Sequence, residues 1–146
     1  QQLKCDVEVN PFGISYNPLS LAWALHRMLD DRPFTAADLS TDGTRYFSYQ
    51  HHSSFTRRDP TEALAAMNEG LQRGRQQMLN ATVLFLTFGS AWTYVLAGSG
   101  ETVANCHKMP SSMFTRRFVE PEEAAEALGS ALERWREHNP RLKVVL

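Results

Sequence analysis

Thr82-Val83-Leu84-Phe85-Leu86-Thr87-Phe88 is the stretch that decides the fold class of this 146-residue chain. Its apolar character is nearly continuous, which is typical of a central strand that is covered on both faces of a parallel sheet. Gly89 follows directly and ends the predicted strand. The segment is therefore expected to lie in the middle of an α/β domain.

Helix signals stand before and after this strand. Asn17-Pro18 and Asp59-Pro60 each place a capping side chain before a proline at the first helical position, so a helix is predicted to start at each pair. A third helix is expected from about Pro121 to His138. Gly70 and Gly74 weaken the second helix by about 1 kcal/mol each relative to alanine, and their spacing predicts a close approach between that helix and the sheet.

Further strands are predicted from alternation and turn residues. Residues 3–9 alternate strictly between apolar and polar, and residues 142–146 form an apolar run. A short strand is expected at 46–49, and residues 92–96 and 101–105 read as a β-hairpin. Strands joined through helices favour parallel pairing. The predicted fold is a three-layer αβα sandwich with a mainly parallel sheet and a small hairpin.

Both ends of the chain look cut. A strand begins almost at Gln1, and the last predicted strand stops on the apolar Leu146. A buried strand normally continues into a loop that ends it. Residues 1–146 are therefore expected to be a single, partial domain.

Composition and charge narrow the functional classes. The formal net charge of -1 provides no field that would draw the chain to nucleic acid or to an anionic membrane. No apolar run approaches the roughly 20 residues that span a bilayer. Cys5 and Cys106 show neither metal-type nor disulfide spacing, which favours a reducing, cytoplasmic setting. No phosphate loop, dinucleotide fingerprint or G-x-S-x-G elbow is present, so no cofactor is predicted.

Two glycines follow predicted strands where ligands bind in open parallel sheets, beyond the carboxyl ends of the strands. Gly13 closes the turn after the first strand, and Gly89 follows the central one. Backbone N–H groups near both could stabilise a developing oxyanion. The alternative is that each glycine only permits a turn. We expect Gly13, Gly89 and Asn105 to lie together at one end of the sheet.

Polar residues after the hairpin form a second candidate. Asn105-Cys106-His107-Lys108 combines an amide, a thiol and an imidazole, although neighbouring side chains on an extended segment point to opposite faces. Cys106 is thus either a nucleophile with a base from elsewhere or a packed, inert thiol. His51 and His52 could join His107 in a zinc site, or be ordinary polar loop histidines.

Four motifs resemble segments of the GSCFA family. Residues 10–18, NPFGISYNP, resemble its "NPFG…YNP" segment, and residues 86–94, LTFGSAWTY, resemble its "TLGTAWVY" segment. Residues 103–110, VANCHKMP, resemble "VANCHKxP", and residues 52–55 fit its "HHSxF" loop. The four matches occur in the family's order and cover most of the chain.

The resemblance implies a fold like that of the SGNH esterases. It implies a serine ester hydrolase or acyltransferase whose nucleophile would precede Gln1 and whose histidine would follow Leu146. The substrate would be a small-molecule or glycan acyl ester. Two alternatives remain: a non-catalytic binding module of the same fold, and a metal-dependent site that uses the histidines.

The resemblance also assigns a rim for the substrate. Gly13 and Gly89 would match glycines that donate backbone hydrogen bonds to the oxyanion. Ala91 stands where the SGNH pattern has an asparagine, and Ser90 stands where threonine is usual in the family. Asn105 or His107 would supply polar contacts to a bound ester.

Overall fold

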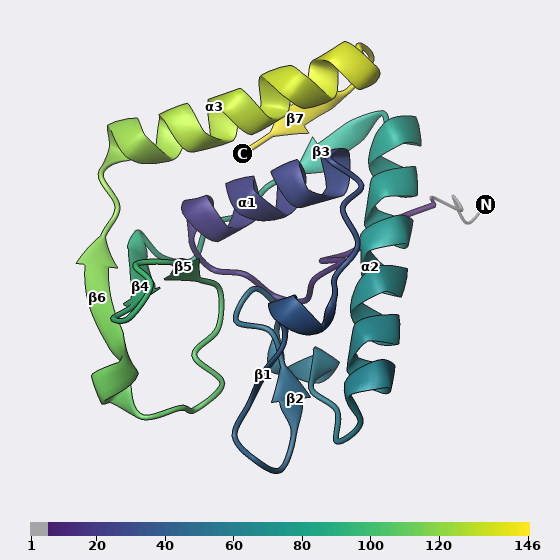
Figure 1. Ribbon diagram of the computed structural model, residues 1–146. Helices are drawn as coiled ribbons and strands as arrows, with labels where there is room; N and C mark the ends of the chain where they lie inside the picture. The colour runs from purple at the N-terminus through teal and green to yellow at the C-terminus, as the bar shows by residue number, and fades with distance from the viewer. Residues whose placement is uncertain (1–5) are drawn as a thin grey trace, which may run out of the picture.

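The computed structural model describes residues 6–146, which contain three α-helices, three short 3-10 helices and three small sheets (Figure 1). The helices are α1 (Pro18–Leu29), α2 (Pro60–Asn80) and α3 (Pro121–His138), and all three begin where the sequence predicts. The fold is thus mixed α/β, as expected. None of these helices combines the length and hydropathy that a bilayer-spanning segment needs.

Local capping chemistry explains the helix starts. The Asn17 side chain accepts a hydrogen bond from the Ser20 N–H at 2.8 Å, and the Asp59 side chain accepts one from the Glu62 N–H at 2.9 Å. Each bond satisfies a backbone donor that the first turn of a helix leaves unpaired. Each helix also has a proline in its first positions, where the missing N–H has no consequence.

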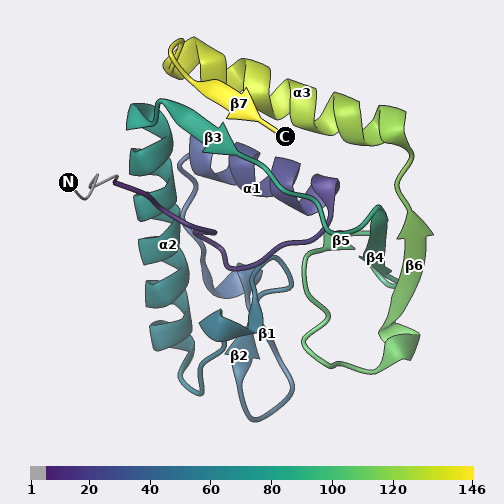
Figure 2. The ribbon, with the colours of Figure 1, turned by 180° about the vertical axis from the view of Figure 1, so that it is seen from behind.

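The predicted central strand is real but short. β3 (Val83–Phe85) pairs in parallel with β7 (Lys143–Val145), with Leu84 opposite Val144. Viewed from behind, both strands lie in front of α1 and α3, which cover one face of the pair (Figure 2). The other face is open, since the side chain of Phe85 is 71% exposed. Coverage on both faces, predicted for this strand, is therefore wrong for the described residues.

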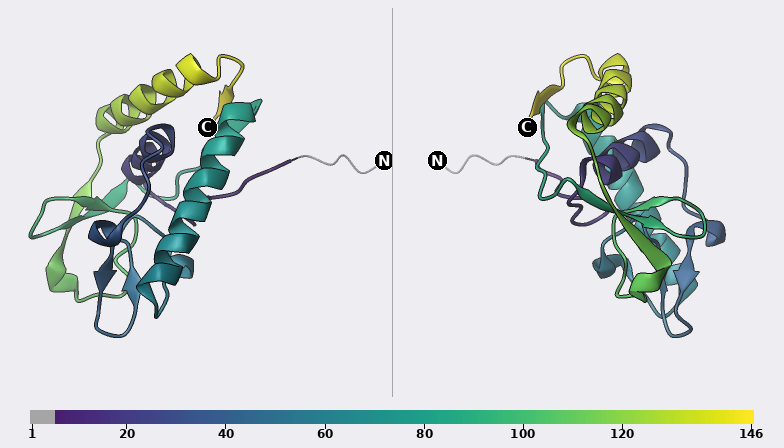
Figure 3. Two further views of the ribbon diagram at one scale, coloured as in Figure 1. Left: turned by 45° about the vertical axis from the view of Figure 1, so that its right-hand side comes forward. Right: turned by 90° about the vertical axis from the view of Figure 1, so that its left-hand side faces the viewer.

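A second sheet contains the predicted hairpin and one strand that was not predicted. β4 (Trp92–Leu96) pairs antiparallel with β5 (Thr102–Val103) on one side and with β6 (Phe114–Phe118) on the other. Two short antiparallel strands, β1 (Ser40–Thr41) and β2 (Tyr46–Phe47), form the remaining sheet. Figure 3 shows that β4, β5 and β6 lie on the side of the molecule away from α2.

The sheet prediction needs two corrections. Residues 6–9 are in no strand, and residues 3–5 of the predicted first strand lie outside the described residues. A strand requires a partner for its backbone groups, whereas the Asp6 carbonyl instead accepts a hydrogen bond from the Gln77 side chain at 3.1 Å. The parallel sheet of the described residues has two strands, so the predicted three-layer sandwich with a mainly parallel sheet is not confirmed.

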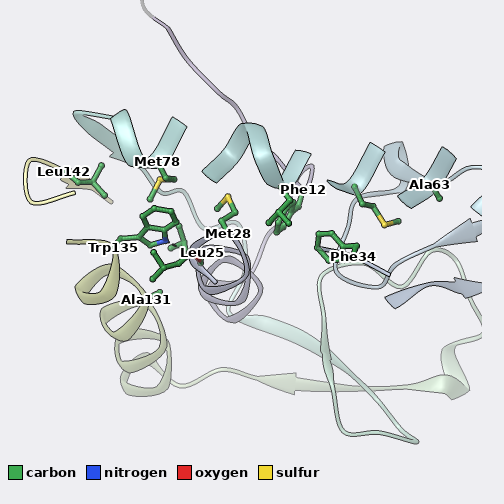
Figure 4. Close-up of a cluster of buried hydrophobic side chains, with 12 residues drawn as sticks. Phe12, Leu25, Met28, Phe34, Ala63, Met78, Ala131, Trp135 and Leu142 are labelled. Carbon is green, nitrogen blue, oxygen red and sulfur yellow. Dashed lines mark hydrogen bonds between the residues drawn. The ribbon is translucent and has the colours of Figure 1, made fainter. Parts of the chain in front are cut away.

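The main hydrophobic core lies between the three helices. Trp135 on α3 is fully buried, and its indole N–H donates to the Leu25 carbonyl of α1 at 2.9 Å. Figure 4 shows its ring beside Leu25, Met78 and Leu142. One aromatic side chain thus contacts α1, α2 and the segment leading into β7 from its place on α3. The contact is stabilising because a buried indole contributes both apolar area and a satisfied donor.

Gly70 and Gly74 permit a close approach, but to a loop and not to a sheet. A Cβ added to Gly70 would clash with the carbonyl oxygen of Pro11, and one added to Gly74 would lie 2.7 Å from the Pro11 Cβ. The loop that carries Pro11 therefore rests directly on α2. The predicted contact with the sheet is wrong. The two glycines still have the expected effect, because the absence of a side chain lets another segment approach α2 closely.

A buried histidine lies among aromatic rings near this loop. His51 is fully buried, with ring centroids 4.9 Å from Phe12, 4.6 Å from Phe34 and 5.0 Å from Phe55. Neither ring nitrogen has a hydrogen-bond partner within the described residues. Burial, with added repulsion from His107 and Arg27, lowers the pKa of His51 to about 3. The imidazole is therefore neutral and acts as an apolar core ring.

Replacing Gly70 by alanine tests the contact between loop and helix. We expect Gly70→Ala to lower the free energy of unfolding by about 2 kcal/mol, because the new methyl group must displace a backbone carbonyl. Gly129→Ala is the matched control, since nothing lies within 4 Å of its added Cβ, and it should raise stability by about 0.5–1 kcal/mol. Urea unfolding of both variants measures the difference, and equal gains would contradict the close approach.

Replacing His51 by leucine tests the neutral buried imidazole. Because the folded-state pKa lies below the ordinary value of about 6.5, the unfolded chain binds the extra proton, and stability is lost as the pH falls from about 6.5 towards 3. Between these two pH values the free energy of unfolding falls by about 1.4 kcal/mol for each pH unit. We expect the free energy of unfolding of His51→Leu to differ from that of the parent by less than about 1 kcal/mol at pH 7. At pH 5 the variant should be about 2 kcal/mol more stable relative to the parent than it is at pH 7. A constant difference between pH 7 and pH 5 would show that His51 is not the group responsible.

Candidate functional site

Backbone hydrogen bonds join the segments that carry the predicted site residues. The His52 N–H donates to the Phe12 carbonyl at 2.9 Å. The Tyr16 carbonyl accepts from the N–H groups of Gly89 and Ser90, each at 3.0 Å. The Tyr49 carbonyl in turn accepts from the N–H groups of Ala104 at 2.9 Å and Asn105 at 3.0 Å. The structure thus links these segments in one series of contacts.

Gly13 occupies a position that only glycine fits. Its φ of +82° is in the left-handed region, and an added Cβ would clash with the Cβ of His52. Its N–H donates to the Asn10 carbonyl at 2.7 Å, which closes the turn. In this conformation the N–H of Gly13 is therefore used within the chain, as the turn interpretation expects.

Gly89 and Ser90 are held by the start of α1. Both N–H groups donate to Tyr16, the residue before the helix cap Asn17. The Ser90 hydroxyl oxygen accepts from the Trp92 N–H at 2.9 Å, and its own donor meets only the Trp92 carbonyl at a long 3.4 Å. Since a hydrogen bond weakens at such a distance, the Ser90 hydroxyl can turn from the Trp92 carbonyl and donate to a ligand at little cost.

Asn105 follows β5 and lies outside the ladder with β4. The last register pair is Tyr94 opposite Val103, and the N–H groups of Ala104 and Asn105 donate to the Tyr49 carbonyl and not to β4. The side-chain oxygen of Asn105 accepts from the His107 N–H at 2.8 Å. The half-buried Asn105 amide therefore supports the turn that follows it.

His107 lies in the interior of the protein, beneath the turn that Asn105 supports. Its side chain is 3% exposed, its ring stacks on Phe47 at 4.4 Å, and its Nε2 donates to the Ser48 carbonyl at 2.9 Å. That bond assigns the neutral tautomer with the proton on Nε2. Burial lowers the pKa of His107, so the ring stays neutral near pH 7. His107 anchors its loop to the core and does not reach a substrate in this conformation.

Cys106 has the properties of a packed thiol. It is half-buried, and burial raises the pKa of its thiol, which disfavours the nucleophilic thiolate. The neighbouring imidazole of His107 is turned to Ser48 and offers no base. The structure therefore favours the inert interpretation of Cys106.

The histidines do not assemble a metal site in the described part of the chain. No group of three His, Cys, Asp or Glu side chains gathers as possible ligands within residues 6–146. His51 is enclosed by aromatic rings, and the Nδ1 of His52 accepts from the Ser54 N–H at 3.2 Å as a helix cap. Each histidine thus has a structural role in this conformation.

An apolar groove of about 460 Å³ lies beside Gly89 and Ser90. Its other walls come from the end of β6 and the first turns of α3, with Phe118, Val119 and Leu128 among the lining residues. This groove was not predicted from the sequence. β6 reads Phe-Thr-Arg-Arg-Phe and does not alternate between apolar and polar residues, so periodicity offered no signal for this wall of the groove.

The comparisons with known proteins give one result. The family model that matches is that of the GSCFA family, and the match covers residues 1–146. No curated protein and no solved structure matches the chain. Because the family match spans every residue given, the chain belongs to the GSCFA family.

Proposed function

We propose that this chain is part of an SGNH-type ester hydrolase or acyltransferase, whose serine nucleophile and histidine base lie outside residues 1–146. The observation that carries the proposal is the position of Ser90. Its hydroxyl donates just one long hydrogen bond, it lines an apolar groove, and its N–H is fixed through Tyr16 to the segment that carries Gly13. An ester needs this pairing of a polar contact for its carbonyl and an apolar surface for its acyl part.

The proposed reaction is acyl transfer through a serine ester. The nucleophile's oxygen bonds to the acyl carbon, and the histidine base takes the proton that this oxygen loses. The carbonyl oxygen becomes an oxyanion, and the Ser90 hydroxyl donates a hydrogen bond to it. When the carbonyl re-forms, the alkoxide leaves with the proton from the histidine. Water or a second alcohol then attacks the serine ester and releases the acid or a new ester.

Ser90 takes the place of a missing side-chain donor in this proposal. The SGNH pattern has an asparagine at the position of Ala91, and the hydroxyl one residue earlier supplies a hydrogen bond instead. Gly13 and Gly89 shape the rim, because their N–H groups donate to Asn10 and Tyr16. Asn105, two residues after the end of β5, contributes a polar group to the rim.

The complete domain, in the same proposal, is a three-layer αβα sandwich. Helices α1 and α3 cover one face of the parallel pair β3 and β7. The other face presents Val83, Phe85 and Val145, with exposed fractions of 40%, 71% and 45%. An apolar sheet face of this kind is usually covered by further elements. A cytoplasmic setting is proposed with it, from the cysteine pattern of the sequence.

A binding module of the same fold is the second candidate. This candidate is favoured because the backbone N–H groups of Gly13 and Gly89 both donate to carbonyls within the chain. Neither N–H group is therefore open to an oxyanion in this conformation. Ala91 removes one further donor. Such a module would hold a ligand in the groove without any covalent step.

Replacing Ser90 by alanine tests the assigned donor in the full-length protein. Loss of one oxyanion donor typically lowers kcat by about a hundredfold or more, and we expect this with KM nearly unchanged. Ser99→Ala is the matched control, because Ser99 lies in the exposed hairpin turn and its hydroxyl oxygen only accepts from the Glu101 N–H at 3.3 Å. Unchanged kcat in Ser90→Ala, measured on a p-nitrophenyl ester, would remove Ser90 from the mechanism.

Labelling of the full-length protein by a fluorophosphonate separates the two candidate functions. An activated serine forms a covalent adduct with this reagent because its hydroxyl is deprotonated by a base. We expect one labelled serine, outside residues 1–146, identified by mass spectrometry, and equal labelling of the Ser99→Ala variant. A folded protein that is not labelled would establish the binding module in place of the esterase.

A further inference from the structure

The apolar groove lies where three parts of the fold meet. One wall is the segment after β3, with Phe88, Gly89 and Ser90, and another is the end of β6 at Phe118. Helix α3 supplies the floor through Ala124 and Leu128. The groove therefore begins at the rim that the proposed function uses and continues away from it over hydrocarbon side chains.

The lining carries no charged side chain. Ser90 is the one lining residue with a polar side chain, and the remaining lining residues are alanine, glycine, leucine, phenylalanine, proline and valine. A sugar requires several hydrogen-bonding partners when it leaves water, because each unpaired buried hydroxyl is costly. These walls cannot provide them, whereas an aliphatic chain needs none.

The cations nearest in sequence to the groove are already engaged. Arg117 donates two hydrogen bonds to the Glu123 carboxylate, at 2.7 and 2.9 Å. The guanidinium of Arg116 lies over the Trp92 ring at 4.1 Å. The carboxylate of a free fatty acid would therefore lack an unpaired cation on these residues. A neutral ester does not require one.

We propose that the groove binds the aliphatic acyl chain of a neutral ester, so that the substrate class is a medium-chain acyl ester and not an acetyl ester. This inference rests on the proposed function and names its substrate. The acyl carbonyl lies at Ser90 and the methylene groups extend along Phe118 towards α3. The volume of about 460 Å³ is in the range of small-ligand pockets, and an acetyl group would leave most of the groove empty.

The test compares p-nitrophenyl octanoate with p-nitrophenyl acetate as substrates of the full-length protein. We expect kcat/KM to favour the octanoate by at least about tenfold, since each buried methylene adds to binding in the transition state. Ala125→Trp fills the groove and should lower that ratio by at least about tenfold. Ser130→Trp is the matched control on α3, because Ser130 is exposed and lines a different groove, and it should keep the parent ratio.

Circular dichroism and thermal unfolding of both tryptophan variants confirm that each is folded before rates are compared. Hydrolysis of both esters with an unchanged ratio in Ala125→Trp would overturn the acyl-chain assignment and leave the esterase proposal standing. A folded protein with no fluorophosphonate label and no turnover of either ester would overturn the proposed function, and this inference with it. A shift of the Ser130→Trp ratio equal to that of Ala125→Trp would also overturn the assignment, because the effect would then not belong to this groove.

Discussion

The close contact between the loop around Pro11 and helix α2 is the constraint on which the rest of the structure depends. Pro11 rests where α2 presents Gly70 and Gly74 instead of side chains. This contact places the next residue, Phe12, in the core against Phe34. Packing of this density tolerates little displacement. The surface of the helix therefore determines the position of the loop that carries the site.

The site inherits its position from that loop. Gly13 turns the chain against His52, and three residues later the Tyr16 carbonyl holds the N–H groups of both Gly89 and Ser90. The following residue, Asn17, caps α1. One short segment therefore connects the core, the start of a helix and the proposed rim, so damage to the core contact is expected to reach the rim as well.

Local chemistry was predictable from the sequence, and long-range pairing was not. The starts of α1 and α2 follow from a capping side chain and a proline, which act within one turn. The strand signal of Val83–Phe85 was correct, but its neighbours and the coverage of its faces depend on segments far away in the chain. Residues 6–9 alternate between apolar and polar side chains but form no strand. Alternation indicates which side chains a strand would bury, and it does not indicate whether a partner strand is present.

The same distinction explains the candidate site. That Gly13 needs glycine could be predicted, and its φ of +82° agrees. Whether its N–H is available depends on the carbonyl it meets, and that is Asn10. His107 looked like a surface ligand because imidazole is polar, yet Phe47 and the Ser48 carbonyl enclose it. The proposed role of Ser90 has the same origin, because only the folded chain shows that Ser90 lines an apolar groove and that its hydroxyl donates just one long hydrogen bond, of 3.4 Å.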